Sequence, residues 1–226
     1  MKTYVMKAFR PVSGLFRGTS GFSLIELMSV MAIFSILAAA SFPSVKGVMD
    51  SYNICGAADL VESQIALARQ SAMSRNIAVE VRIYRYNDGN GDAWRAMALV
   101  IPAEVSGRAT DEWVTQSLHF PGSIILEDSS SYSSVLTAAQ PPPAAGKWTA
   151  PWSGTESSTT APRALLGKKY VSFRFQPNGS TNLPSDKPWC LTLKPLNSKP
   201  VSGRPAPHFV SLVVDSMTGR TSLYQP

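Results

Sequence analysis

An apolar run of 21 residues, from Phe22 to Phe42, constrains the fold of this chain more than any other feature. As an α-helix it would extend about 31 Å, close to the thickness of the hydrocarbon core of a bilayer. Its only charged residue is Glu26. A carboxylate in such a run is energetically expensive, and ionisable residues there are usually functional. The run therefore predicts a transmembrane helix over residues 22–42 that carries one functional carboxylate.

The residues before this run are basic and contain no acid. They hold four of the 21 basic residues, which leaves 17 basic against 15 acidic residues, a net charge of +2, in the rest of the chain. Positive residues stay on the cytoplasmic side of a membrane. We therefore expect residues 1–21 in the cytoplasm and the C-terminal bulk in the periplasm. The overall charge of +6 is largely a topology signal and gives no reason to expect nucleic acid as a partner.

The stretch Gly21-Phe22-Ser23-Leu24-Ile25-Glu26-Leu27 resembles the processing and assembly signal of type IV pilin-like proteins. In that family a membrane peptidase cuts after the glycine, the new N-terminal amine is methylated, and the apolar helix becomes the spine of a filament. The resemblance implies that leader 1–21 is removed after Gly21, that Phe22 is the methylated first residue, and that Glu26 is the assembly carboxylate. The implied partners are a prepilin peptidase, other pilin or pseudopilin subunits and the inner membrane.

Elementary electrostatics supports a role for Glu26. A cut after Gly21 would create a positive amine at Phe22, about one helical turn from the carboxylate. Each charge alone is costly in hydrocarbon, whereas a pair is partly neutralised. The pair could form within one chain, but the resemblance implies that it forms between neighbouring subunits. The alternative is that Glu26 snorkels to the membrane interface at the end of its helix.

A second interpretation of the N-terminus is a secretory signal peptide. Ala38-Ala39-Ala40 is an A-x-A site after a basic region and an apolar run. A cut after Ala40 would give an exported soluble protein that begins at Ser41. The long basic region and the carboxylate of Glu26 argue against this interpretation.

After Pro43 the sequence predicts an amphipathic helix over residues 43–75. Apolar residues follow a 4-3-4-3-4 spacing, which places them on one stripe. The helix is expected to run to about Ser74, with Asn76 as its stop. The members of the stripe are Ile54, Ala58, Val61, Ile65, Ala68 and Ala72.

From residue 76 onward the apolar period changes to two, which is typical of strands. Val79, Val81 and Ile83 alternate with polar residues and predict a half-buried strand. The predicted fold is α+β and pilin-like: a long N-terminal helix, membrane anchor plus amphipathic half, packed on an antiparallel sheet in a periplasmic domain over 76–226. Further strands are expected at Trp94–Ile101, Leu118–Phe120, Ile124–Leu126, Val171–Phe175, Trp189–Leu193, Phe209–Val214 and Thr221–Tyr224.

Residues 127–167 are rich in Ser, Pro, Thr and Ala and predict a loop or partly disordered insertion. Trp148 and Trp152 are unusual in such a segment. They are expected to dock the loop on the domain, or else to form a contact surface.

The C-terminal part resembles the GspH/FimT group of minor pseudopilins, including the turn Thr218-Gly219-Arg220. Its strand blocks also look like Verru_Chthon cassette protein D, a pilin-like family. The resemblance implies a structural subunit, a minor pilin or pseudopilin of a type IV pilus or type II secretion filament. These blocks are Val79–Asn87, Tyr170–Leu183, Trp189–Leu193 and Phe209–Pro226.

Cys55 and Cys190 are the only cysteines, and an exported domain could join them in a disulfide. The alternative is that the two cysteines are small buried apolar residues. The distance and orientation of the two side chains decide between these alternatives. His119 and His208 have no acidic or cysteine neighbour at metal-ligand spacing. No catalytic or phosphate-binding motif is present, so we expect no enzyme, small-molecule substrate, cofactor or metal.

Two weaker patterns were weighed against simpler interpretations. Asp88, Asn90 and Asp92 have the alternating oxygens of a calcium loop, but position twelve is Leu99, which favours a hairpin turn. Some FimT-like proteins bind DNA through C-terminal basic residues, here Arg204 and Arg220. No aromatic-interleaved basic run supports nucleic-acid binding, and a tip-located binding module for adhesion or DNA uptake remains the alternative function.

Overall fold

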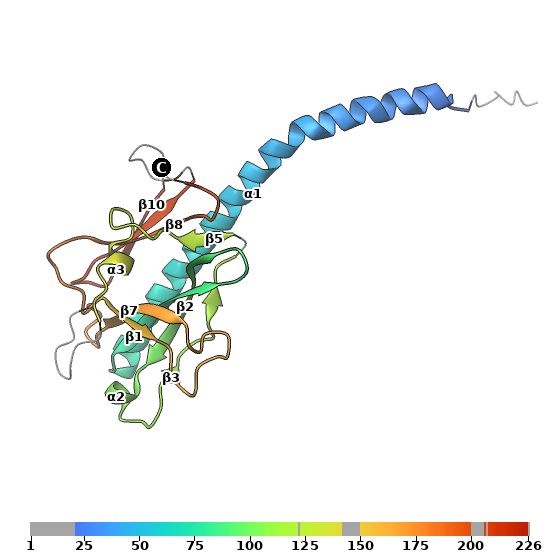
Figure 1. The fold of residues 1–226 in the computed structure, drawn as a ribbon. Helices are drawn as coiled ribbons and strands as arrows, with labels where there is room; N and C mark the ends of the chain where they lie inside the picture. The colour runs from blue at the N-terminus through green and yellow to red at the C-terminus, as the bar shows by residue number, and fades with distance from the viewer. Residues whose placement is uncertain (1–20, 122, 142–149, 200–205, 207, 226) are drawn as a thin grey trace, which may run out of the picture. The chain divides into compact units, whose positions relative to one another are not determined.

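The structure is a computed structural model that describes residues 21–121, 123–141, 150–199, 206 and 208–225 (Figure 1). Side chains of residues 41–46 are not described. The chain divides into two units, Met1–Val45 and Lys46–Pro226. Helix α1, Leu24–Arg75, contributes to both units.

In the first unit, Ser23 begins α1. Its carbonyl accepts hydrogen bonds from the N–H groups of Glu26 and Leu27 at 3.0 and 3.1 Å, which makes Ser23 the N-cap residue. The hydroxyls of Ser29 and Ser35 donate to helix carbonyls one turn back, both at 2.8 Å. The helix predicted for this segment is therefore present. The hydroxyls of Ser29 and Ser35 form their hydrogen bonds within it.

In the second unit, α1 ends where the sequence indicates. The last helical residue is Arg75, and Asn76 follows with a φ of 51°, the left-handed conformation common after helix ends. All six residues of the predicted stripe are 2% exposed or less. The amphipathic helix and its buried face are thereby confirmed.

The strands form one antiparallel sheet in the order β10-β9-β8-β5-β2-β1-β7-β6, and β3 and β4 also pair with β2. Short helices α2, Ala103–Ser106, and α3, Ser134–Thr137, complete the elements. The strands are β1 Val79–Asn87, β2 Asp92–Ile101, β3 Glu112–Trp113, β4 Leu118–His119, β5 Ile124–Leu126, β6 Trp152–Thr155, β7 Lys169–Phe175, β8 Trp189–Pro195, β9 Val210–Val214 and β10 Thr221–Tyr224.

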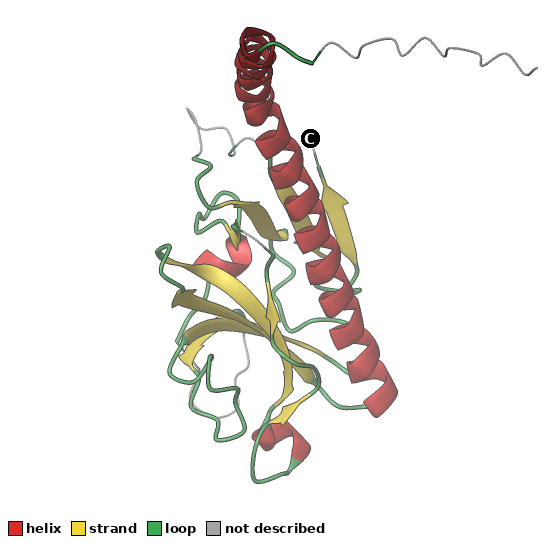
Figure 2. Ribbon diagram, turned by 90° about the vertical axis from the view of Figure 1, so that its right-hand side faces the viewer, coloured by secondary structure: helices red, strands yellow, loops and turns green. Residues whose placement is uncertain are grey.

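The main core lies between the C-terminal half of α1 and the sheet (Figure 2). Val81 and Ile83 of β1 and Phe173 of β7 are fully buried in this cluster, together with Ile65 and Ala68 of α1. Alanine on the helix stripe lets the strands approach closely. The predicted α+β fold, a long helix packed on an antiparallel sheet, is confirmed.

One expectation for β1 was wrong: the strand is buried on both faces. Glu80 is 1% exposed, Arg82 is 6% exposed and Tyr84 is fully buried. Alternation of apolar and polar residues correctly identified two different faces. The polar face is nevertheless covered, because its charges are paired with side chains from the segments after β2 and β6.

The described part of the insertion, residues 127–141 and 150–167, is more ordered than predicted. It contains α3 and β6, and β6 pairs with β7 in antiparallel register. Trp152 is 3% exposed, so the docking expected of this residue is confirmed. Trp148 lies outside the described residues.

Candidate functional site

The candidate site begins at Gly21, just before α1. No heavy atom lies within 4 Å of the position that a Cβ would take, and the residue does not have a left-handed backbone. The fold of the described residues therefore gives no reason for glycine at this position. A requirement for glycine at position 21 would come from a protein that binds this segment.

Phe22 and Glu26 lie on either side of the start of α1. The Phe22 side chain is 81% exposed, and Glu26 occupies the first helical turn. Ser23-Leu24-Ile25-Glu26 has the spacing of a capping box, and the positive end of the helix dipole favours a carboxylate here. An amine created at Phe22 would meet the same positive end unfavourably. Glu26 is the acidic residue of this first turn.

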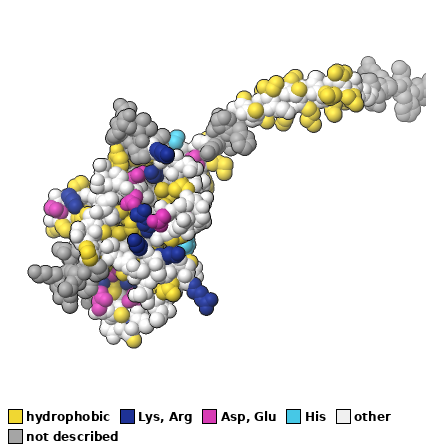
Figure 3. Space-filling model, in the orientation of Figure 1, with side chains coloured by type: hydrophobic (Ala, Val, Ile, Leu, Met, Phe, Trp, Pro, Cys, Tyr) yellow, Lys and Arg dark blue, Asp and Glu magenta, His cyan; other side chains and the backbone are white. Residues whose placement is uncertain are grey.

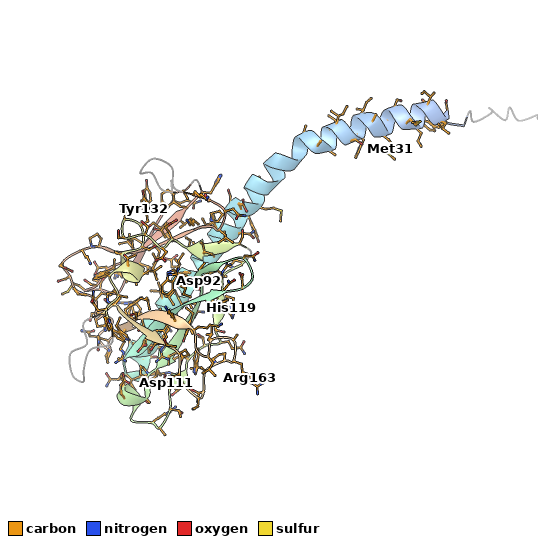
Figure 4. The ribbon with its side chains drawn as sticks, in the orientation of Figure 1. Met31, Asp92, Asp111, His119, Tyr132 and Arg163 are labelled. Atoms are coloured by element: carbon orange, nitrogen blue, oxygen red, sulfur yellow. The ribbon has the colours of Figure 1, made fainter. Side chains whose placement is uncertain are left out.

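The first unit exposes a nearly continuous apolar surface (Figure 3). Eleven large side chains are 55–81% exposed, and Met31, one of them, is labelled in Figure 4. A helix that is apolar all round is stable when membrane or protein buries it. Within the described part of the chain, no helix is both long and apolar enough to cross a membrane. The eleven are Phe22, Leu24, Ile25, Leu27, Met28, Val30, Met31, Ile33, Phe34, Ile36 and Leu37.

A buried ionic network on the sheet is the polar feature that the sequence analysis missed. The Arg82 guanidinium pairs with Glu80 at 2.8 Å, and with Asp111 and Glu156 at 2.9 Å each. Arg174 of β7 pairs with the other oxygen of Glu80, also at 2.9 Å. Glu80 and Arg174 are directly opposite in the β1–β7 register. Opposite charges on two predicted strands were the available signal, but the pairing of these strands was not predicted.

This network joins the sheet to the segments that cover it. Asp111 precedes β3 and Glu156 follows β6, so one guanidinium fixes two connections on the strand. Tyr84 donates a hydrogen bond to Glu156 at 2.6 Å, and burial followed by this bond raises the pKa of Tyr84. Burial also raises the pKa of Tyr170 to about 12. Every charge in the arrangement has a partner, as buried charges require.

The two cysteines are free thiols, so the disulfide considered for them is not formed. Cys55 lies on α1, where its sulfur accepts a hydrogen bond from Gln225 at 3.5 Å. Cys190 lies on β8, where its sulfur is 3.4 Å from the hydroxyl of Ser134. Each thiol has its own neighbours, and both are half-buried rather than fully buried.

The Asp88–Asp92 loop is a hairpin turn between β1 and β2. Asp88 pairs with Arg95 at 2.9 Å, and Asp92 pairs with Arg85 at 2.7 Å. The N–H of Asn90 donates to Asp88, and this bond, with Arg95, lowers the pKa of that carboxyl. The carboxylates considered for calcium are thus arginine partners. No cluster of three or more His, Cys, Asp or Glu in the described segments is placed to hold a metal ion.

The remaining candidates are dispersed. Nδ1 of His119 is 2.6 Å from the hydroxyl of Tyr86, and His208 is exposed with a φ of 57°. Arg220 is exposed in the turn before β10, whereas Arg204 lies outside the described residues.

Comparison with known proteins places one signature on this chain. The prokaryotic N-terminal methylation motif matches residues 16–42, a range that contains Gly21, Phe22 and Glu26. Neither curated proteins nor solved structures gave a match. The match covers 27 of the 226 residues and shows the prepilin-type motif, which implies processing by a prepilin peptidase and a precursor anchored in the inner membrane. Pilin-like proteins, which carry this motif, are generally structural and non-enzymatic.

Proposed function

We propose that this chain is a structural subunit, a minor pilin or pseudopilin, of a type IV pilus or type II secretion filament. A prepilin peptidase cuts between Gly21 and Phe22, and the new amine of Phe22 is methylated. The processed chain then enters the filament through its N-terminal helix, with Glu26 as the assembly carboxylate. The narrower likeness to GspH/FimT proteins, or to Verru_Chthon cassette protein D, belongs to this proposal.

The observation that carries the proposal is an exposed, all-round apolar helix with a single carboxylate in its first turn, directly after the glycine of the motif. Fully burying one large apolar side chain is worth about 1.5–3 kcal/mol. Eleven such side chains therefore give a strong drive to leave water. A membrane and a bundle of identical helices can each supply that burial.

Passage from membrane to filament is energetically balanced for such a helix. Its backbone hydrogen bonds are internal, and the hydroxyls of Ser29 and Ser35 are satisfied within it. Exchange of lipid for apolar protein changes little, because both environments are apolar. The pair between Glu26 and the amine of Phe22 is then the interaction that selects one register.

The proposal also assigns a location. The precursor spans the inner membrane once over residues 22–42, with leader 1–21 in the cytoplasm and the domain of 76–226 in the periplasm. The mature subunit resides in a filament or at the cell surface. Two alternatives are weaker: a tip-located binding module loses Trp152 as a contact because this residue is buried, and an exported protein cut after Ala40 requires a start at Ser41.

Substitution of Gly21 by lysine tests the cleavage assignment. Because a Cβ at Gly21 meets no atom within 4 Å, the fold should accept the change. We expect the full-length precursor to accumulate in membranes, as measured by the intact mass of the purified chain. Normal processing of Gly21→Lys would remove this residue from the mechanism.

Substitution of Glu26 by alanine tests the assembly step separately. We expect Glu26→Ala to be cut normally but to be lost from sheared filaments, because the amine of Phe22 has no partner. Ser29→Ala on the next turn of the helix is the matched control and should assemble. Normal incorporation of Glu26→Ala would contradict the role of the carboxylate.

A further inference from the structure

The acidic residues of this chain fall into two groups. All 15 are described, and nine of them form an ion pair with an arginine or lysine. Of the six that do not, Asp50, Asp59 and Glu62 belong to the domain half of α1, where Glu62 accepts a hydrogen bond from Thr221 at 3.3 Å. The other three are Glu26, Asp186 and Asp215.

The arginines show the same division. Of the nine with described side chains, Arg69, Arg163 and Arg220 are the ones without an ion pair. Arg69 and Arg220 line one groove of about 670 Å³ between α1 and the turn before β10. Arg220 also borders a hollow that contains Asp186 and Asp215, without an ion pair to either. Two of the three unneutralised guanidiniums thus share one groove.

Arg69 is positioned but not neutralised. Its Nε donates to the carbonyls of Thr218 and Gly179 at 2.9 and 3.2 Å, which fixes the stem of the side chain against the turn. Its two Nη atoms have no partner among the residues that the structure describes. A guanidinium held in this way presents its free nitrogens at the groove without further loss of side-chain entropy.

The unpaired acid and the groove lie along one side of α1. Asp59, Ser63, Ala66 and Gln70 follow a 4-3-4 spacing, so they form one stripe parallel to the helix axis. Ala66 and Gln70 line the groove, and Asp59 is exposed. Eleven residues of helix put Asp59 about 16 Å from Gln70 along the axis. One copy therefore cannot pair its own Asp59 with the groove, whereas a copy shifted along the axis can.

We propose that this stripe is a contact between two copies of the chain, in which Asp59 of one copy pairs with the Arg69–Arg220 groove of the next. The inference rests on the proposed function, because copies anchored in one membrane share one orientation and their α1 helices run parallel. The contact is head-to-tail, so it repeats along an open assembly. Complementary charge gives this contact its specificity.

A phosphate group is the competing occupant of the groove. Two guanidiniums bind phosphate as well as carboxylate. The unpaired Asp59 on the same stripe of α1 favours a second copy, since nucleic acid would leave Asp59 without a cation and would be repelled by it. Binding of double-stranded DNA is accordingly one outcome of the test.

The test uses two full-length copies with different affinity tags, expressed together and co-purified from membranes. One copy carries Asp59→Arg and the other Arg220→Glu, both exposed positions. When either variant is present in both copies, we expect co-purification to fall about tenfold, because like charges face each other. When one tagged copy carries Asp59→Arg and the other carries Arg220→Glu, each contact between the two copies again joins opposite charges. Co-purification should then return. Arg163→Glu changes an exposed arginine outside the groove, labelled in Figure 4, and should have no effect.

The inference is overturned if single reversals leave co-purification unchanged, or if the mixed pair fails to recover it. It is also overturned if Arg220→Glu abolishes binding of a double-stranded DNA oligonucleotide while co-purification is unaffected. The N-terminal mass of each variant is measured in the same samples. Cleavage after Gly21 with no charge-dependent pairing refutes the contact alone, and absence of cleavage refutes the proposed function.

Discussion

Gly219, in the turn between β9 and β10, is the glycine whose replacement by alanine the structure penalises most clearly. Its φ is +64°, in the left-handed region. A Cβ there would lie 2.2 Å from the carbonyl oxygen of Gly179 and 2.8 Å from the ring of Phe175. Backbone would have to move to admit it, because the nearest atom is a carbonyl oxygen rather than a flexible side chain.

The expected loss has two separable parts. A left-handed backbone costs a residue with a Cβ about 1–2 kcal/mol. Forcing atoms into a packed site costs about 1–3 kcal/mol more. Gly107→Ala is the matched control, since Gly107 has a φ of +70° and nothing within 4 Å of its Cβ position. The control should lose only the first part, and Gly219→Ala about 2–5 kcal/mol.

Thermal unfolding of the full-length protein in mild detergent, followed by circular dichroism, measures the difference. For a chain of this size, 1–3 kcal/mol corresponds to a Tm lower by about 2–12 °C for Gly219→Ala than for Gly107→Ala. Equal losses in the two variants would refute the steric argument. No loss in either would also refute the argument from the left-handed backbone.

Three further predictions concern the domain. Arg82→Ala should lower the free energy of unfolding by about 3–5 kcal/mol in urea titration, because the buried carboxylate of Glu156 and that of Asp111 lose their ion-pair partner, whereas Glu80 keeps Arg174. A loss below about 1 kcal/mol would contradict the network. The pKa of Tyr170 is raised to about 12, so this residue binds its proton more tightly in the folded chain, and its contribution to stability is intact below pH 10 and lost as pH rises toward 12. Tyr170→Phe should therefore flatten the dependence of stability on pH between pH 10 and 12. An unchanged dependence would exclude Tyr170 as its source. Without reductant, the unfolded chain should take up two alkyl groups, at Cys55 and Cys190, by mass spectrometry; uptake of none would show that they are joined.

The sequence predicts the helix and most strands because their determinants are local. The 4-3 spacing from Ile54 to Ala72 defines the buried stripe of α1, and the apolar period of two defines β1 and β7. It fails at β6, where Ser153 and Gly154 have weak strand preference. That strand depends on pairing with β7, and a Cβ at Gly154 would lie 2.8 Å from the ring of Tyr170, so this ring would have to shift to admit another residue.

The buried charges could not be predicted for a different reason. Alternation shows that Glu80 and Arg82 share a face of β1, but not that another segment covers this face. The cover comes from Asp111 and Glu156, and Glu156 is 74 residues from Arg82 along the chain. The site before α1 is the opposite case, since no heavy atom lies within 4 Å of the position that a Cβ of Gly21 would take, and the motif alone carries the information.

The most direct test of the account is the N-terminal residue and intact mass of the protein recovered from its native host. The account predicts a chain that begins at Phe22 and carries one methyl group on its amine. A chain that begins at Ser41, or that retains residues 1–21, would contradict it.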